Sequence, residues 1–204
     1  MPALAAELNQ RLAALREQTL FRELRRVDSA QGPRIDIGGK IFLNFSSNDY
    51  LGLADHPALK EAAIKAAEKF GAGAGASRLI CGSLAPFHEL EETLAKFKKT
   101  DAALTFSTGY AAAVGTITAL LGIDDIIILD KLVHACIVDA AKLSGAKLRV
   151  FDHNDLNDLE DKLNWAAENI QNPTSKIQHP KRILVITESI FSMDGDCAPL
   201  REIV

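Results

Sequence analysis

The sequence predicts an α/β fold in which a mainly parallel sheet is covered by helices on both faces. From residue 102 onward, short apolar segments alternate with helical ones, and strands separated by helices are typical of a parallel sheet. The chain has 204 residues, of which 48% are hydrophobic and 25% charged, the balance of a globular protein with a substantial core. The predicted strands are AALTF (102–106), IIIL (126–129), KLRVF (147–151) and ILVITE (183–188).

The part of the chain before these strands is predicted to contain a helix, a hairpin and a second helix. Leucines fall mostly at helical spacing between residues 3 and 26. RIDIGGKIFLNF (34–45) alternates around a Gly-Gly turn, which indicates a hairpin. His56-Pro57 opens a helix with one apolar stripe, formed by Leu59, Ala62, Ala63, Ala66, Ala67 and Phe70.

The remaining helices are predicted between and around the strands. One carries Leu90, Leu94 and Phe97, and another begins after Pro199. A third, at 156–169, has the pair Asn154/Asp155 before it as a possible cap. The other expected helices are AAAVGTITALL (111–121), ended by Gly122, and HACIVDAAKLSG (134–145), and the most exposed connection is QNPTSKIQHPK (171–181).

Composition excludes several classes of protein. A net charge of −4 and a pI near 5.7 give no reason to expect nucleic acid or an anionic membrane as partner. The cysteines at 81, 136 and 197 have no ligand spacing, so we expect no metal site and no disulfide framework. The first residues form a charged amphipathic segment, and the apolar runs are too short to span a bilayer, so we expect a soluble, cytoplasmic protein.

The run GAGAGASRLICG (71–82) has the composition of a phosphate-binding loop but the wrong position for one. Such a loop follows a strand and opens a helix, whose first amides face the phosphate. Here Gly71 follows a predicted helix, so it is placed to end that helix, and no Gly-Lys-Ser/Thr tripeptide occurs. The sequence therefore predicts a closely packed connection.

A better phosphate site is predicted where AALTF runs into Ser107-Thr108-Gly109-Tyr110, which opens a helix. Free backbone amides, hydroxyl groups and the positive end of the helix dipole favour an anion there. Ser and Thr are also the commonest helix caps, so an ordinary cap remains the alternative.

Two more polar segments follow predicted strands. His134 stands beyond IIIL, at the edge where open α/β sheets bind ligands, although a satisfied, partly buried histidine is the alternative. The last strand ends at Glu188, and a turn at Asp194-Gly195 follows it. Because these segments meet at one edge of a parallel sheet, the sequence predicts a pocket at that edge.

Several motifs together resemble the α-oxoamine synthases, pyridoxal-phosphate (PLP) enzymes of the aspartate-aminotransferase fold. The motifs agree in order and spacing from about residue 20, and they are NFSSNDYLGLADHP (44–57), GAGAGASRLICG (71–82), HELEETLA (88–95), FSTGY (106–110), DKLVHACIVDA (130–140) and TESIFSMDGDCAPL (187–200). The resemblance implies residues 1–43 as an N-terminal helix and hairpin segment, and 44–204 as the first part of the large PLP-binding domain.

The resemblance also implies roles for individual residues. Ring stacking on PLP is assigned to His134, where the family usually has His-Ala-Ser and this chain has His134-Ala135-Cys136. The remaining cofactor contacts are assigned to the amides of Gly109 and Tyr110, which would hold the phosphate, and to Glu188 and Ser192. Substrate contacts are assigned to Asn48, for the amino-acid carboxylate, and to Arg22, with Arg25 as the alternative, for the acyl group.

The segment LRRVDSAQGPRIDIGGKIFLNFSSNDYLGL (24–53) resembles the family members that condense L-alanine with a pimeloyl thioester, carried on CoA or on acyl carrier protein. The implied reaction is a decarboxylative condensation with PLP as electron sink, in a homodimer. In the family, the Schiff-base lysine and the Asp that pairs with the pyridinium nitrogen come after the position of Val204. The expectation is therefore the amino-terminal half of a longer enzyme, inactive alone.

Two other functions remain open at this point. The first is another α-oxoamine synthase, such as a 2-amino-3-ketobutyrate CoA ligase or a palmitoyltransferase subunit, with a different amino acid or acyl chain. The second is a chain without the lysine that acts as a non-catalytic dimer partner.

Overall fold

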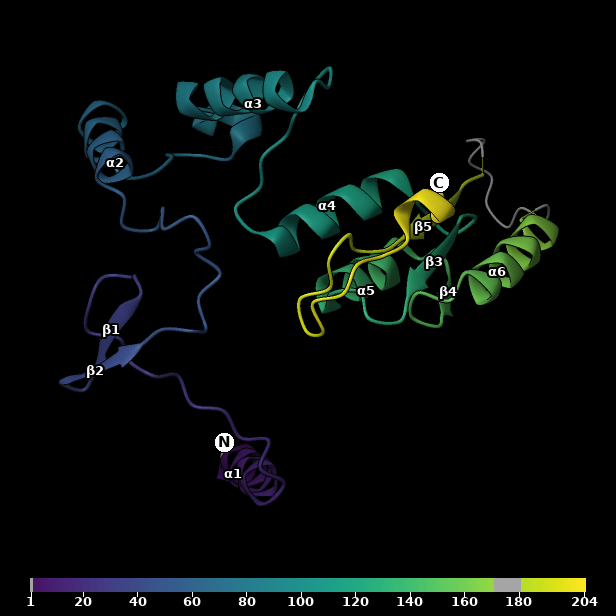
Figure 1. Cartoon of the computed structure of the whole chain (residues 1–204), viewed down its shortest axis with the longest axis horizontal. Helices are drawn as coiled ribbons and strands as arrows, with labels where there is room; N and C mark the ends of the chain where they lie inside the picture. The colour runs from purple at the N-terminus through teal and green to yellow at the C-terminus, as the bar shows by residue number, and fades with distance from the viewer. Residues whose placement is uncertain (1, 171–180) are drawn as a thin grey trace. The chain divides into compact units, whose positions relative to one another are not determined.

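The computed structural model describes residues 2–170 and 181–204 (Figure 1). Contacts divide the chain into two compact units, 1–84 and 85–204. The predicted connection at 171–181 lies almost wholly outside the described residues. The predicted boundary after residue 43 concerns the functional domains and stays a prediction.

The first unit contains two helices, a hairpin and a short π-helical turn. The elements are α1 (Pro2–Glu17), β1 (Arg34–Ile37), β2 (Lys40–Leu43), α2 (Pro57–Phe70) and η1 (Arg78–Gly82). β1 and β2 pair antiparallel as predicted. Their turn uses Gly38 and Gly39 at φ +61° and +78°, a conformation that glycine adopts without strain. α2 also has its predicted bounds, with His56 as the N-cap.

The predicted helix at 3–26 is too long, because α1 ends at Glu17. Thr19 adopts φ +58°, outside the right-handed helical region, so the helix stops there. Arg16 then stacks its guanidinium over the Phe21 ring, 4.2 Å from the centroid. Arg22 and Arg25 consequently lie in an irregular segment between α1 and β1.

The glycine run after α2 forms a loop followed by the turn η1. Gly71 ends α2 at φ +84°, and its amide donates to the Ala67 carbonyl at 2.9 Å, as the predicted helix stop requires. At Gly82, an added Cβ would lie 1.8 Å from the Ala76 carbonyl oxygen. The end of the run is therefore closely packed, as predicted. An added Cβ at Gly71, Gly73 or Gly75 would meet nothing within 4 Å, so the first part of the run is open where close packing was predicted.

The second unit alternates helices and strands, as predicted. The elements are α3 (Ala85–Lys98), α4 (Gly109–Leu120), β3 (Ile126–Asp130), α5 (Ala135–Ser144), β4 (Lys147–Phe151), α6 (Leu156–Asn169), β5 (Ile183–Ile186) and α7 (Leu200–Ile203). Asp155 caps α6 by accepting from the amides of Asn157 and Asp158. The strands form one parallel sheet in the order β4-β3-β5.

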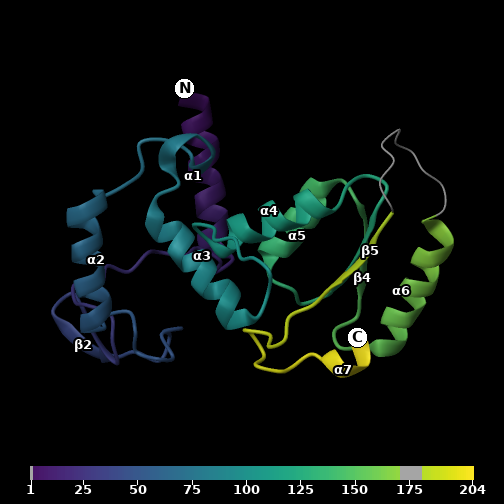
Figure 2. The same ribbon diagram turned by 90° about the horizontal axis from the view of Figure 1, so that it is seen from above.

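Helices cover both faces of this sheet (Figure 2). Ile127 and Leu129 of β3 pack with α4 and α5, whereas Ile126 and Ile128 pack with α6. All five residues of β3 are buried. The predicted fold class, a parallel sheet between helices, is confirmed, since strands buried on both faces are continuous apolar runs.

The predicted strand at 102–106 is absent from the structure. The amide and the hydroxyl of Thr105 donate to Glu91 Oε1 of α3, at 2.8 and 2.9 Å. Leu104 is 67% exposed, so the segment does not contribute to the core. The Glu91 carboxylate therefore accepts the hydrogen bond from the Thr105 amide that a neighbouring strand would accept in a sheet.

A buried carboxylate joins three elements at the amino end of β3. Asp125 is fully buried, and its Oδ1 accepts from the amide of Arg182, just before β5, at 2.8 Å. Its Oδ2 accepts from the amide of Gly122, just after α4, at 2.8 Å. Its carbonyl accepts from the amide of Lys147, at the start of β4. Each carboxylate oxygen thus has a backbone partner, as a buried charge requires.

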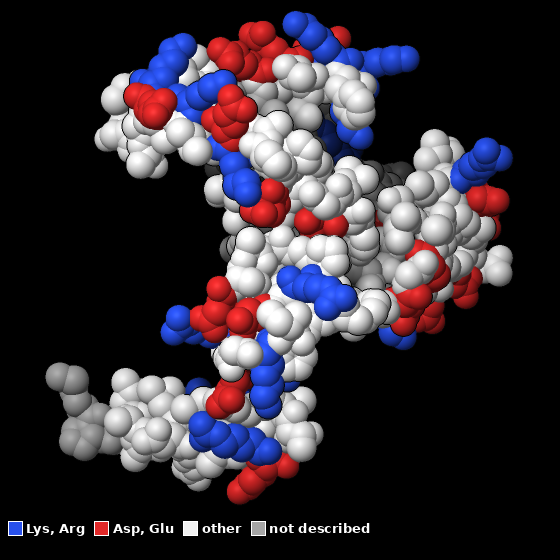
Figure 3. All heavy atoms as spheres, turned by 60° about the vertical axis from the view of Figure 1, so that its left-hand side comes forward, with Lys and Arg blue, Asp and Glu red and all other residues white. Residues whose placement is uncertain are grey.

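Charges of both signs are interspersed on the face shown in Figure 3. Two ion pairs span one turn of a helix: Arg11–Glu7 in α1 and Lys65–Glu61 in α2, both at 2.6 Å. These pairs are exposed, so each contributes only a few tenths of a kcal/mol. Among the described residues, no helix has the length and apolarity needed to cross a membrane.

We predict that Asp125→Asn destabilises the chain by about 1–3 kcal/mol, since one oxygen becomes an NH₂ group that cannot accept from a backbone amide. Urea unfolding measures the change. Asp139→Asn, on the exposed face of α5, is the control and should leave the midpoint nearly unchanged. Equal midpoints for the two variants would contradict the role assigned to Asp125.

Candidate functional site

A pocket of about 330 Å³ lies at the carboxyl ends of β3 and β5. Its lining comes from two segments, one between β3 and α5 and one after β5. The lining residues are Leu132, Val133, His134, Ala135, Glu188, Phe191, Ser192, Met193 and Asp194. This is the edge where parallel α/β sheets bind ligands, and the volume is that of a small-molecule site.

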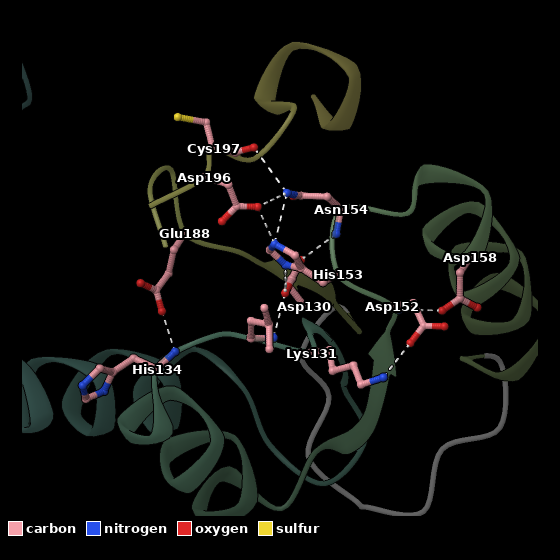
Figure 4. Close-up of polar contacts among 11 residues, drawn as sticks. Asp130, Lys131, His134, Asp152, His153, Asn154, Asp158, Glu188, Asp196 and Cys197 are labelled. Atoms are coloured by element: carbon pink, nitrogen blue, oxygen red, sulfur yellow. Dashed lines mark hydrogen bonds and ion pairs between the residues drawn. The ribbon is translucent and has the colours of Figure 1, made fainter. Parts of the chain in front are cut away.

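Glu188 connects the two segments (Figure 4). Its Oε1 accepts from the backbone amide of His134 at 2.5 Å. His134 is also the N-cap of α5, because its Nδ1 accepts from the amide of Cys136 at 3.2 Å. The structure therefore brings together three of the predicted site residues, His134, Glu188 and Ser192, at one pocket.

Cys136 stands where the family resemblance leads us to expect serine. Its Sγ lies 3.0 Å from Nδ1 of His134, so the thiol occupies the place from which a hydroxyl would contact the ring. The thiol is a weaker hydrogen-bond donor than a hydroxyl would be.

Gly109 and Tyr110 form the first turn of α4 and are not part of the pocket lining. Thr108 caps this helix, its Oγ1 accepting from the amide of Ala111 at 3.0 Å. Among the described residues, none accepts a hydrogen bond from the amides of Gly109 or Tyr110. An added Cβ at Gly109 would meet nothing within 4 Å. Two free amides and open space at a helix N-terminus suit an anion.

The predicted substrate residues Arg22 and Asn48 lie in the first unit, and both are exposed. The Asn48 carbonyl accepts from the amide of Tyr50 at 2.9 Å, inside the turn at 48–52. Arg22 and its alternative Arg25 lie in the irregular segment that follows α1.

A cluster of polar residues beside the pocket was missed by the sequence analysis. Asp130, His153, Asn154 and Asp196 meet at the carboxyl end of the sheet (Figure 4). His153 Nδ1 lies 2.8 Å from Asp130 Oδ1, and Nε2 lies 2.7 Å from Asp196 Oδ2. The sequence carries one signal for it, since Asp130 ends β3 and His153 closely follows β4.

These contacts raise the pKa of His153 above its ordinary value of 6.5. The largest cause is the hydrogen bond to Asp130, followed by the bond to Asp196, while burial of the ring acts in the opposite direction. Asp130 is 1% exposed. Its Oδ1 also accepts from the amide of Leu132 at 2.8 Å, and its Oδ2 from the amide of Asn154 at 3.2 Å.

Comparison with known proteins gives the family. The sequence model for aminotransferase class I and II matches residues 40–204. The chain belongs to this family. Its α/β sheet, helix-covered on both faces, is accordingly part of the aminotransferase fold that the sequence motifs predict.

Curated relatives of this aminotransferase-family chain include named synthases. The 8-amino-7-oxononanoate synthase of Geobacter sulfurreducens is 47% identical over 202 residues, covering 99% of this chain and 48% of the relative. That of Thermoanaerobacter pseudethanolicus is 43% identical over 198 residues, covering 97% and 47%. The chain therefore spans about half the length of these relatives. The predicted resemblance to the α-oxoamine synthases, and among them to 8-amino-7-oxononanoate synthase, is confirmed.

Solved structures of similar fold agree with the family assignment. A serine palmitoyltransferase variant from S. paucimobilis, with bound PLP–myriocin aldimine, has a TM-score of 0.81 and 30% identity over 96% of this chain and 47% of its own. The 8-amino-7-oxononanoate synthase of Francisella tularensis has a TM-score of 0.60 and 30% identity over 78% and 40%. The family and its PLP-bound structural neighbour support pyridoxal phosphate as cofactor.

The residues of this aminotransferase-family chain fit such a cofactor. PLP needs an anion site for its phosphate, which the free amides of Gly109 and Tyr110 can supply. It also needs a ring-sized space with polar groups, and the pocket at His134, Glu188 and Ser192 has both.

We predict that Glu188→Ala destabilises the chain by about 1–2 kcal/mol, because the amide of His134 loses a charged acceptor. Glu188→Gln keeps an oxygen acceptor and should lose less. Chemical unfolding of the two variants and the parent chain measures their free energies of unfolding, which should fall in the order parent, Glu188→Gln, Glu188→Ala. Glu168→Ala, at an exposed site on α6, is the control and should unfold like the parent chain; a loss as large as that of Glu188→Ala would refute the assignment.

Proposed function

We propose that the protein containing this chain is a PLP-dependent acyltransferase, 8-amino-7-oxononanoate synthase. It condenses L-alanine with pimeloyl-CoA or pimeloyl-ACP, with loss of carbon dioxide, in biotin biosynthesis. The observation that carries the proposal is 43–47% identity to proteins of that name over almost the whole chain. The pocket at the carboxyl ends of β3 and β5 supports it.

Residues of the second unit hold the cofactor in this proposal. The amides of Gly109 and Tyr110 bind the phosphate, and His134 stacks on the pyridine ring. Ser192 contacts the cofactor and Glu188 lies beside it. When bound, PLP supplies an electron sink for the Cα of the amino acid. Glu188 also fixes the backbone of His134, and so keeps the imidazole oriented.

Residues of the first unit bind the substrates in this proposal. Asn48 contacts the carboxylate of L-alanine through its side-chain amide. Arg22, or Arg25 in its place, contacts the pimeloyl chain, whose terminal carboxylate matches the planar fork of a guanidinium. Both arginines are exposed in the present structure, as a residue that meets a diffusing substrate must be.

We also propose that the protein acts in the cytoplasm as a homodimer whose active site lies at the interface between subunits. The expected solution mass of the full-length protein is therefore that of two chains. Sedimentation measures it, and a mass of one chain at micromolar concentration would contradict the dimer.

We predict that the full-length protein releases thiol fastest with L-alanine and pimeloyl-CoA. Reaction of the released thiol with a chromogenic disulfide follows the rate, and trapped carbon dioxide confirms the decarboxylation. Glycine with acetyl-CoA tests the 2-amino-3-ketobutyrate ligase activity, and L-serine with palmitoyl-CoA tests the activity named for the similar solved structures. A higher kcat/KM with either of these pairs would overturn the assignment.

A variant pair connects that activity to the described pocket. His134→Ala should lower kcat/KM by about tenfold or more, since misplacement of a bound reactant costs one to two orders of magnitude. Lys142→Ala, on the exposed face of the same helix, is the matched control and should keep the parent rate. Equal losses in the two variants would indicate damage to α5 and not to the site.

A further inference from the structure

His153 lies at the junction of three separate parts of the second unit. Its ring is placed between Asp130, the last residue of β3, and Asp196, in the segment that returns from the pocket (Figure 4). The segment 191–197 closes on itself, because the amide of Phe191 donates to the carbonyl of Asp196 at 2.9 Å. We call this segment the pocket loop, since it contains Ser192, Met193 and Asp194 of the pocket lining.

The ring of His153 has a carboxylate acceptor on both sides. Nδ1 and Nε2 each lie within 2.8 Å of a carboxylate oxygen. A neutral imidazole donates from only one nitrogen, so its other nitrogen would direct a lone pair at a carboxylate. The amide Nδ2 of Asn154 also lies 3.2 Å from Nε2, farther away than the Asp196 carboxylate. Only the imidazolium donates to both carboxylates, and charge-assisted bonds of this kind are about twice as strong as neutral ones.

Neighbouring groups fix the ring and the pocket loop in this arrangement. Phe191 packs edge-on against the imidazole, with centroids 4.4 Å apart and planes at 87°. Asn154 Nδ2 donates to Asp196 Oδ2 at 3.0 Å and to the Cys197 carbonyl at 3.3 Å. The loop thus depends on residues that follow β4, although it comes after β5 in the chain.

We propose that His153 is a positioning residue: by bridging Asp130 and Asp196 it holds the pocket loop against the carboxyl end of the sheet. It thereby determines where Ser192 stands in the pocket. The proposal rests on the proposed function in one respect: the cofactor that Ser192 would contact belongs to that function. The bridge itself is a property of this chain's own residues.

Two carboxylates face the ring, those of Asp130 and Asp196, and both raise the pKa of His153. The charged residues nearest to these groups in the chain are Lys131, Asp152, Asp155, Asp158, Glu188 and Asp194. Most of these have partners of their own. Asp152 pairs with Lys131 at 3.1 Å, and Asp158 with Lys162 at 2.7 Å. Asp155 caps α6, and Glu188 accepts from the amide of His134.

The pH dependence follows from the sign of the pKa change. The folded chain holds the proton of His153 more tightly than the unfolded chain does, because the pKa is raised. The bridge therefore contributes its full stability below the ordinary value of 6.5. That contribution is lost as the pH rises through the raised pKa.

Hydrogen exchange of the pocket loop in the full-length protein, measured at different pH values, tests the proposal. The reporters are the amides of Phe191 and Gly195, which donate within the loop to Asp196 and Phe191. NMR titration gives the pKa of His153, assigned among the five histidines by its loss in His153→Gln. We expect this pKa above 6.5, and protection factors that fall about tenfold as the pH rises through it.

Two variants remove the bridge from opposite sides. His153→Gln and Asp196→Asn should both lower protection at pH 6 about tenfold and abolish its pH dependence. Asp152→Asn alters a neighbouring carboxylate that does not touch the ring, and should match the parent chain. If His153→Gln does not fold, the Asp196→Asn variant and the pH series of the parent chain still test whether the bridge holds the pocket loop. Equal protection in parent and variants, or titration of His153 at or below 6.5, would overturn the proposal.

Fluorescence-detected PLP binding to the same samples separates this proposal from the proposed function. If protection follows the state of His153 but the full-length parent protein binds no PLP, the cofactor assignment fails and the positioning role stands. If the parent binds PLP and both bridge variants bind it with unchanged affinity, the role of the bridge in placing Ser192 is refuted.

Discussion

Complete burial of β3 is the constraint on which the second unit depends. A strand with apolar contacts on both faces can present polar groups only at its two ends, and Asp125 and Asp130 occupy these positions. Each carboxylate is buried and fully engaged, yet the two ends differ. Asp125 accepts only from backbone amides, which have one protonation state. Asp130 also lies 2.8 Å from an imidazole, whose protonation depends on pH.

Much of the second unit could be predicted because its local signals agree with its packing. Apolar runs at 126–129 and 147–151 became β3 and β4, and Asp155 caps α6 as its position suggested. The segment 102–106 shows the limit of this reasoning. It is as apolar as the true strands, but Glu91 binds its backbone. Strand formation depends on a partner, which composition does not reveal.

The candidate site was predictable to the extent that it follows strand ends. His134 and Glu188 each stand beyond an apolar run, and parallel strands bring such positions to one edge. Their direct contact, made by the backbone amide of His134, has no signature in residue types. His153 was missed for a related reason: its significance comes from Asp196, which is distant in the chain and adjacent only in space. The end of α1 was missed as well, because the positive φ of Thr19, just after the helix, cannot be inferred from the spacing of leucines.

The strand order β4-β3-β5 also has a consequence for how the unit assembles. On one edge β3 pairs with β4, and the paired residues Ile126 and Lys147 are separated by a single short helical crossover. On the other edge β3 pairs with β5, where the partner of Ile126 is Ile183, much farther along the chain. Because closing a longer loop costs more chain entropy, the ribbon of β3, β4 and α5 is the natural nucleus, and β5 docks later. The pocket loop follows β5, so in this sequence of events it becomes ordered only after β3 and β4 have paired.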